Sequence, residues 1–189
     1  GDITVHVHIE WLAGILVDGK PEQLGDIQCI LAGWIDLEVT RRGDRTFNQV
    51  NTWGLLPMVN YSQTPQAGER SEQILLSVLS EEGIQPRVYP HVEDQDLLVL
   101  DDRKRYEQAL QWAQGQSFDY LVSGSVEEWQ YKNGLDGEPA VGLSLRVLDA
   151  RTGQVLWSNS GARAGWSRES LAGSAQKVLN TLIGDLRID

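Results

Sequence analysis

The chain has 189 residues, of which 41% are hydrophobic and 23% charged, as in an ordinary folded protein of one domain or one domain with an appendage. Its 16 basic and 27 acidic residues leave a formal net charge of −11, which argues against nucleic-acid binding because that function needs basic patches. The single cysteine, Cys29, excludes an intramolecular disulfide and a thiolate metal cluster.

The N-terminal residues predict extended structure. Apolar and polar residues alternate over residues 3–11, a pattern typical of a half-buried strand, and residues 29–39 form a second extended run. We therefore expect a small β-rich segment of uncertain role over residues 1–51. The main α/β domain is expected over residues 52–189.

Neither a membrane span nor a signal peptide is expected within the chain. No stretch approaches the roughly 18 apolar residues that a span needs. The residues before Cys29 are Asp26, Ile27 and Gln28, which do not form the small apolar context of a lipoprotein acylation site. Any lipid anchor is therefore expected outside this chain.

The main domain opens with a short apolar strand over residues 52–60. Thr64 and Pro65 then predict a helix with a threonine N-cap and proline at its first position, and Gly83 predicts its end. A brief strand is expected over residues 84–90.

The second half of the domain predicts a helix, three strands and a final helix. The first helix runs from about Asp102 to Gly115. The three strands lie in series, with hairpin turns between them, over residues 119–131, 139–149 and 153–161. The final helix carries apolar residues at 3- and 4-residue spacing from Leu171 onward. This order predicts an α/β sandwich, with a mixed sheet whose C-terminal antiparallel strands are covered by helices.

We expect neither an enzyme nor a cofactor protein. The chain lacks a nucleophile elbow, a phosphate loop and a dinucleotide fingerprint. His6, His8 and His91 could in principle bind a metal, but without a nearby cysteine they are better interpreted as solvated histidines. Ser123, Gly124 and Ser125 lie inside a predicted strand, where small residues favour close packing over nucleophilic attack.

Two carboxylate pairs are candidates for glycosidase chemistry, which requires both groups in one cleft. They are Glu127 with Glu128, and Asp136 with Glu138. Adjacent residues on a regular strand point to opposite faces, so Glu127 and Glu128 are not expected to act together.

Trp166 has two interpretations. With Ser167 as the N-cap of the last helix, Trp166 and Leu171 would occupy the positions of a hydrophobic staple. Alternatively, Trp166 projects outward at the turn between Arg163 and Arg168, where a tryptophan beside arginines would suit a membrane interface.

The motifs "LP" after an apolar strand, "DYLVSGSV" and "LDARTGQVLWS" resemble those of CsgG-like outer-membrane lipoproteins. Together with "NYSQTPQAGER" and "GARAGWSRES", they make residues 52–187 resemble the PelC family, lipoproteins of Pel exopolysaccharide export. The fold implied is a CsgG-like α/β sandwich. Residues 1–51 depart from the family pattern, in which a signal peptide and an acylated cysteine would come close before the domain.

The resemblance implies a ring, expected to be a dodecamer, on the periplasmic leaflet of the outer membrane. Trp166, Arg163 and Arg168 would contact lipid. An acidic funnel would guide a cationic amino-sugar polysaccharide to the outer-membrane export channel, PelB. The candidate funnel residues form the densest acidic cluster of the chain, although a solvated loop would look the same: Glu93, Asp94, Asp96, Asp101 and Asp102.

Two other functions stay open at this point. A periplasmic lipoprotein of similar fold could bind and activate a cell-wall synthase, in which case it would be monomeric and indifferent to polysaccharide charge. A CsgG-like pore is less favoured, because residues 52–187 hold no pair of long alternating hairpins.

Overall fold

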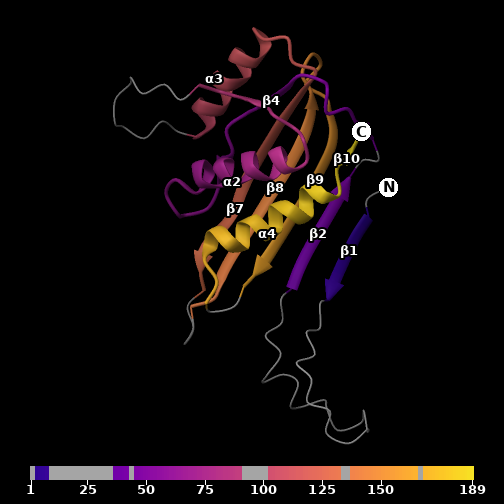
Figure 1. The fold of residues 1–189 in the computed structure, drawn as a ribbon. Helices are drawn as coiled ribbons and strands as arrows, with labels where there is room; N and C mark the ends of the chain where they lie inside the picture. Colours follow the sequence, from indigo (N-terminus) through magenta and orange to yellow (C-terminus); the bar gives the residue numbers. More distant parts are fainter. Residues whose placement is uncertain (1–2, 9–35, 43–44, 91–101, 133–136, 166–167) are drawn as a thin grey trace, which may run out of the picture.

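The computed structural model describes residues 3–8, 36–42, 45–90, 102–132, 137–165 and 168–189 (Figure 1). Its main feature is a mixed eight-stranded sheet in the order β1-β2-β9-β8-β7-β4-β6, with β5 also pairing with β7. Three strands form its antiparallel centre: β7 (Tyr120–Tyr131), β8 (Pro139–Asp149) and β9 (Val155–Ala164). Three short strands run parallel to their neighbours: β4 (Trp53–Leu55), β5 (Val59–Asn60) and β6 (Arg87–Val88). The predicted α/β sandwich is confirmed.

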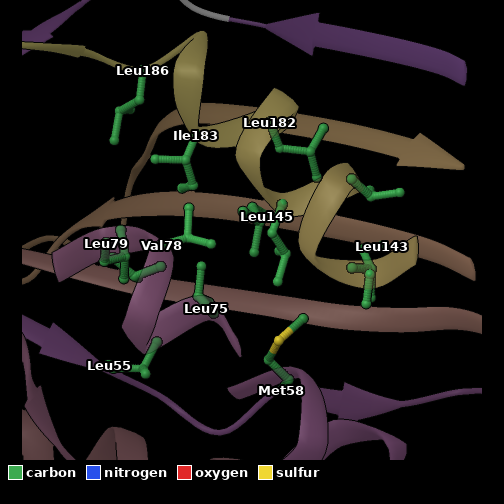
Figure 2. Packing of buried hydrophobic residues seen from close by; sticks show 14 of the residues in the cluster. Leu55, Met58, Leu75, Val78, Leu79, Leu143, Leu145, Leu182, Ile183 and Leu186 are labelled. Carbon is green, nitrogen blue, oxygen red and sulfur yellow. The ribbon is translucent and has the colours of Figure 1, made fainter. Parts of the chain in front are cut away.

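Two helices cover one face of this sheet, α2 (Ala67–Glu81) and α4 (Leu171–Gly184) (Figure 1). Their apolar sides meet the inward residues of β8, among them Leu143 and Leu145, which point toward the helices in Figure 2. Each leucine or valine fully buried here stabilises the fold by about 1.5–3 kcal/mol. This layer is the main hydrophobic core.

The third helix, α3 (Asp102–Gln114), contributes to a smaller core on the other face of the sheet. Ala109 and Ala113 of α3 pack with Leu121 of β7 and Leu148 of β8. Leu121 and Leu148 alternate with the residues that face α2 and α4. Helix α3 therefore covers only one end of the second face.

The N-terminal residues add two strands to the main sheet. β1 (Ile3–His8) pairs antiparallel with β2 (Asp36–Arg42), and β2 pairs antiparallel with β9. Phe47, in β3 (Thr46–Phe47), is buried in the main core, and β3 pairs with β10 (Arg187–Ile188). The expected strand over residues 3–11 is confirmed for residues 3–8. A domain boundary at residue 51 stays a prediction.

The start of α2 differs from the expectation. Its N-cap is Gln66, with a φ of 61° and no side-chain cap, and Pro65 lies in the preceding turn. The Thr64 hydroxyl donates to the carbonyl of Trp129 in β7, which ties the turn before the helix to this strand. The C-terminal prediction is confirmed, since Gly83 follows the helix with a φ of 81°.

Candidate functional site

The turn between β9 and α4 is held by a cluster of charged and polar groups around Glu169. The Glu169 carboxylate accepts hydrogen bonds from Arg163 Nη2 at 3.1 Å, from Lys177 Nζ at 2.8 Å and from Ser174 Oγ at 3.2 Å. Gly165 lies against the same cluster, because a Cβ on it would fall 2.8 Å from both Glu169 and Ser174. The two ends of this turn are therefore fixed by β9 and α4.

The charges around Glu169 set its protonation. Burial acts to raise the pKa of Glu169, but the hydrogen bond from Lys177 and the charge and hydrogen bond of Arg163 outweigh it, so the pKa is lowered from its ordinary value. The carboxylate stays ionised at neutral pH and holds both cations.

Of the three residues expected at a lipid surface, the structure describes Arg163 and Arg168. Arg163 is only 8% exposed and its guanidinium is paired with Glu169, so this position does not fit the expectation that Arg163 reaches lipid. Arg163 lies on the inward side of β9, and its side chain reaches Glu169, the residue before the N-cap of α4. Arg168 is exposed. Trp166 lies outside the described residues.

The hydrophobic-staple interpretation of Trp166 is wrong, because it required Ser167 as the N-cap. The N-cap of α4 is Ser170, whose Oγ accepts a hydrogen bond from the backbone N–H of Gly173 at 3.0 Å. The residue before the cap is therefore Glu169, and its contact with Ser174 is a polar counterpart of the staple.

The acidic cluster expected to form the funnel lies mostly outside the described residues. Glu93, Asp94, Asp96 and Asp101 are not described, and Asp102 is the first residue of α3. Of the other candidates, Asp136 and His91 also lie outside the described residues, and Glu138 lies in the β7–β8 hairpin, where it is exposed. His6 and His8 lie in β1, and the described part of the chain holds no cluster of three metal-binding side chains.

Glu127 and Glu128 are closer together than expected. A β-bulge between Val126 and Glu128 shifts the pairing of β7 with β8, so that both glutamates lie beside Gly142. A Cβ placed on Gly142 would be 3.6 Å from the Glu127 Cβ and 3.4 Å from the Glu128 Cβ. The expectation of opposite faces is therefore wrong, because it assumed a regular strand.

The short Ser123–Gly124–Ser125 stretch has the packing role that was expected. A Cβ on Gly124 would lie 2.6 Å from the carbonyl oxygen of Ser144 and 3.0 Å from the Met58 side chain. Only glycine allows β7 and β8 to approach this closely over the core. The flanking serines point to the opposite face.

Sequence reasoning missed a buried ion pair between α2 and α3. Glu72 accepts hydrogen bonds from Arg105 Nη2 and from the Met58 backbone N–H, each at 2.9 Å. Burial raises the pKa of Glu72, and Arg105 and the Met58 N–H only partly oppose the rise. A signal was present in the sequence, because Glu72 shares the apolar face of α2 with Leu75 and Leu79 at helical spacing.

Comparison with known proteins identifies close structural relatives. No known family profile matches the chain, and no curated protein sequence does. Among solved structures, a PelC dodecamer from Paraburkholderia phytofirmans is 32% identical, with a TM-score of 0.68, over 81% of this chain and 99% of that chain. A second structure, a leucine-to-methionine variant of the PelC dodecamer from the same organism, is 31% identical, with a TM-score of 0.68, over 80% of this chain and 98% of that one.

A more distant structure shares the fold. Lipoprotein GNA1162 from Neisseria meningitidis is 19% identical, with a TM-score of 0.52, over 71% of this chain and 96% of that chain. Among the described helices, none is both long and apolar enough to cross a membrane. The fold and the level of identity to two PelC structures together show that the chain belongs to the PelC family.

Proposed function

We propose that this protein is a non-enzymatic accessory of Pel exopolysaccharide export that forms a ring, expected to be a dodecamer. The observation that carries the proposal is the similarity to PelC dodecamers over almost the whole length of the PelC chain. A closed ring requires a head-to-tail interface in which one face of each subunit complements a different face of its neighbour. The ring would sit in the periplasm on the inner leaflet of the outer membrane.

The acidity of the chain supports a role in guiding a cationic polymer. Each chain carries a net charge of −11, and a ring concentrates that charge around one opening, where low-dielectric walls focus the field. A partly deacetylated amino-sugar polysaccharide carries spaced ammonium groups, so it would be attracted yet remain able to slide toward PelB. We assign the funnel to the acidic residues before and at the start of α3: Glu93, Asp94, Asp96, Asp101 and Asp102.

The membrane contact is assigned to Trp166 and the exposed Arg168. Tryptophan favours the headgroup region of a bilayer, and an arginine beside it can reach lipid phosphates. We assign Arg163 an indirect role, in which it pairs with Glu169 at the end of this turn and does not touch lipid. One tryptophan binds weakly, but a ring presents many copies in one plane and multiplies the attachment.

The first experiment measures the mass in solution by light scattering and the binding to anionic phospholipid vesicles. We expect a large closed oligomer that binds vesicles, and Trp166→Ala is expected to lose vesicle binding while keeping the mass. The control is Val155→Ala, which removes an exposed apolar side chain at the opposite end of β9. A monomer without lipid affinity would refute the ring and favour the synthase-activating lipoprotein.

A second experiment tests the funnel. The triple variant Glu93→Gln, Asp94→Asn and Asp96→Asn is expected to weaken binding of a glucosamine oligosaccharide, and added salt is expected to weaken binding to the wild type. The control neutralises two acids outside the cluster, Glu81→Gln and Glu82→Gln at the end of α2, and the losses are compared per neutralised charge. Equal loss per charge in both variants would show that only the overall charge matters and would remove the assigned funnel.

A further inference from the structure

A cleft opens on the face of the sheet that α2 and α4 do not cover. Its volume is about 240 Å³, close to the lower end of small-molecule sites and suited to a ligand about the size of one sugar residue. It lies between α3, the segment that follows β5, and the strands β7 and β8. The lining residues used below are Tyr61, Arg103, Tyr106, Glu107, Glu127 and Arg146.

The floor of the cleft consists of polar side chains from β7 and β8. Ser123 and Ser125 alternate with the core residues of β7, and Arg146 of β8 is paired in register with Ser123. The Tyr106 hydroxyl of α3 accepts a hydrogen bond from Ser123 Oγ at 3.2 Å, which joins the helix wall to the floor. The walls and the floor of the cleft are therefore joined by a hydrogen bond within the fold, and hydroxyl groups line its floor.

One carboxylate at the cleft is held in place by hydroxyl groups. Glu127 Oε1 accepts from Ser125 Oγ at 2.6 Å and from Ser144 Oγ at 3.4 Å. Glu128, the next residue along the β-bulge, is hydrogen bonded to Gln130 and does not line the cleft. Bulges commonly re-aim a side chain next to a binding site.

An aromatic ring stands at the mouth. Tyr61 is 57% exposed, and its backbone N–H donates to the Val126 carbonyl at 2.8 Å, which ties the backbone of this residue to the bulged strand. An exposed ring that lines a polar cleft offers a flat apolar surface that the C–H face of a sugar can cover.

The charges of the cleft decide which class of ligand it fits. Two arginines, Arg103 and Arg146, and two glutamates, Glu107 and Glu127, line the same space. The carboxylates disfavour an anion and the guanidinium groups disfavour a cation, whereas an uncharged ligand rich in donors and acceptors can use both. The polar floor is also unsuited to an acyl chain.

We propose that the cleft binds one uncharged N-acetylhexosamine residue of a polysaccharide. The sugar ring stacks on Tyr61, Glu127 accepts from a sugar hydroxyl or the amide N–H, and Arg146 donates to the acetyl carbonyl. The assignment of the polymer rests on the proposed export function. The cleft would hold the acetylated units of a partly deacetylated chain, while the acidic funnel acts on its ammonium groups.

The test uses the full chain and two probes of equal length, the N-acetylglucosamine tetramer and the glucosamine tetramer. Binding is measured by titration calorimetry at low salt and at about 0.5 M salt. We expect the N-acetylated tetramer to bind with an affinity that salt does not change. Tyr61→Ala is expected to weaken it about fivefold, and Glu127→Gln about tenfold, because a charged acceptor is lost.

Each variant has a matched control on β7. Glu128→Gln removes the neighbouring carboxylate outside the cleft, and Tyr131→Ala removes another half-exposed tyrosine, at the end of the strand. Both controls are expected to leave the affinity for the N-acetylated tetramer within about twofold of wild type. Circular dichroism of all four variants checks that the fold is kept.

The outcomes separate this inference from the proposed function. If the N-acetylated tetramer does not bind, while the glucosamine tetramer binds in a salt-dependent way, the cleft proposal fails and the funnel stands. If the cleft variants and their controls weaken binding equally, the sugar lies elsewhere and the proposal also fails. A change in the oligomer mass in Tyr61→Ala or Glu127→Gln would instead make the cleft a subunit contact and overturn its assignment to a sugar.

Discussion

The two faces of the central strands of the sheet differ in every property that matters for function. On β8, one face carries Val141, Leu143, Leu145 and Val147, all excluded from solvent under α2 and α4. The alternate positions carry Gly142, Ser144 and Arg146, which lie on the face that holds the cleft. The first face belongs to the larger of the two hydrophobic clusters among the described residues. The second leaves polar groups available for a ligand, because α3 covers only one end of it.

The largest loss of stability is expected when a core side chain is removed. Leu145→Ala, at a position that is 0% exposed, is expected to lower the free energy of unfolding by about 3–4 kcal/mol, because it loses buried apolar surface and leaves a cavity. Ser144→Ala, one residue earlier on the opposite face, is expected to change it by less than about 0.5 kcal/mol. Urea denaturation followed by tryptophan fluorescence measures both. Similar losses would mean that the second face is also part of the folding core.

The next test concerns the attachment of α3 to α2. Glu72→Ala is expected to destabilise the protein by about 3 kcal/mol, because it leaves Arg105 and the Met58 N–H without their acceptor. Gln73→Ala, on the next position of α2 and exposed, is the control. A loss no larger than that of the control would show that the ion pair contributes nothing to stability.

Because the pKa of Glu72 is raised, the contribution of this residue to the stability of the fold depends on pH. A carboxyl whose folded pKa lies above the unfolded value binds protons more tightly in the folded state, so its contribution to stability falls as pH rises from about 4.5 through the folded pKa. Glu72→Gln cannot ionise, so it is expected to gain stability relative to wild type across that window. A constant difference between the two proteins would contradict the raised pKa.

Substitution of two glycines, one on each face, tests how closely the backbone is packed on the two faces. Gly124→Ala is expected to cost about 2 kcal/mol, because its Cβ would lie 2.6 Å from the Ser144 carbonyl oxygen within the core. Gly142→Ala places its Cβ no closer than 3.4 Å to Glu128 on the open face, and a change below about 1 kcal/mol is expected. Thermal unfolding of the two variants decides the order, and the reverse order would contradict the assignment of the faces.

The smallest expected effect lies at the Glu169 cluster. Glu169→Gln is expected to cost about 1 kcal/mol at pH 7, since the charge that holds Arg163 and Lys177 is lost. The folded pKa of Glu169 is lowered, so its contribution is present above the ordinary value of 4.5 and is lost as pH falls through the folded pKa. The stabilities of variant and wild type should therefore converge in acid. A gap that persists in acid would point to lost packing and not to charge.

Periodicity in the sequence was enough to predict most of the fold. The strand over residues 139–149 and the last helix were predicted correctly, because the 3- and 4-residue spacing of apolar residues on that helix follows directly from which residues must be buried. The start of α2 could not be predicted in this way. The turn before α2 is held by a hydrogen bond from the Thr64 hydroxyl to the carbonyl of Trp129 in β7, 65 residues away in the chain.

The candidate site was predictable only in part. The motif around "GARAGWSRES" located the turn, but the partner of Arg163 is set by where α4 begins, and Ser167 and Ser170 are both acceptable N-caps by sequence. The shared face of Glu127 and Glu128 depends on a bulge, which no local residue pattern announces.

The sequence by itself determined the α/β class, the apolar face of the last helix, the acidity and the family resemblance, because each follows from composition or from spacing along the chain. Only the tertiary structure decided that Arg163 is buried, that Glu72 pairs with Arg105 and that a cleft forms beside α3. These features arise between elements far apart in the chain. Their geometry is fixed by how strands and helices pack, and not by the residues next to them.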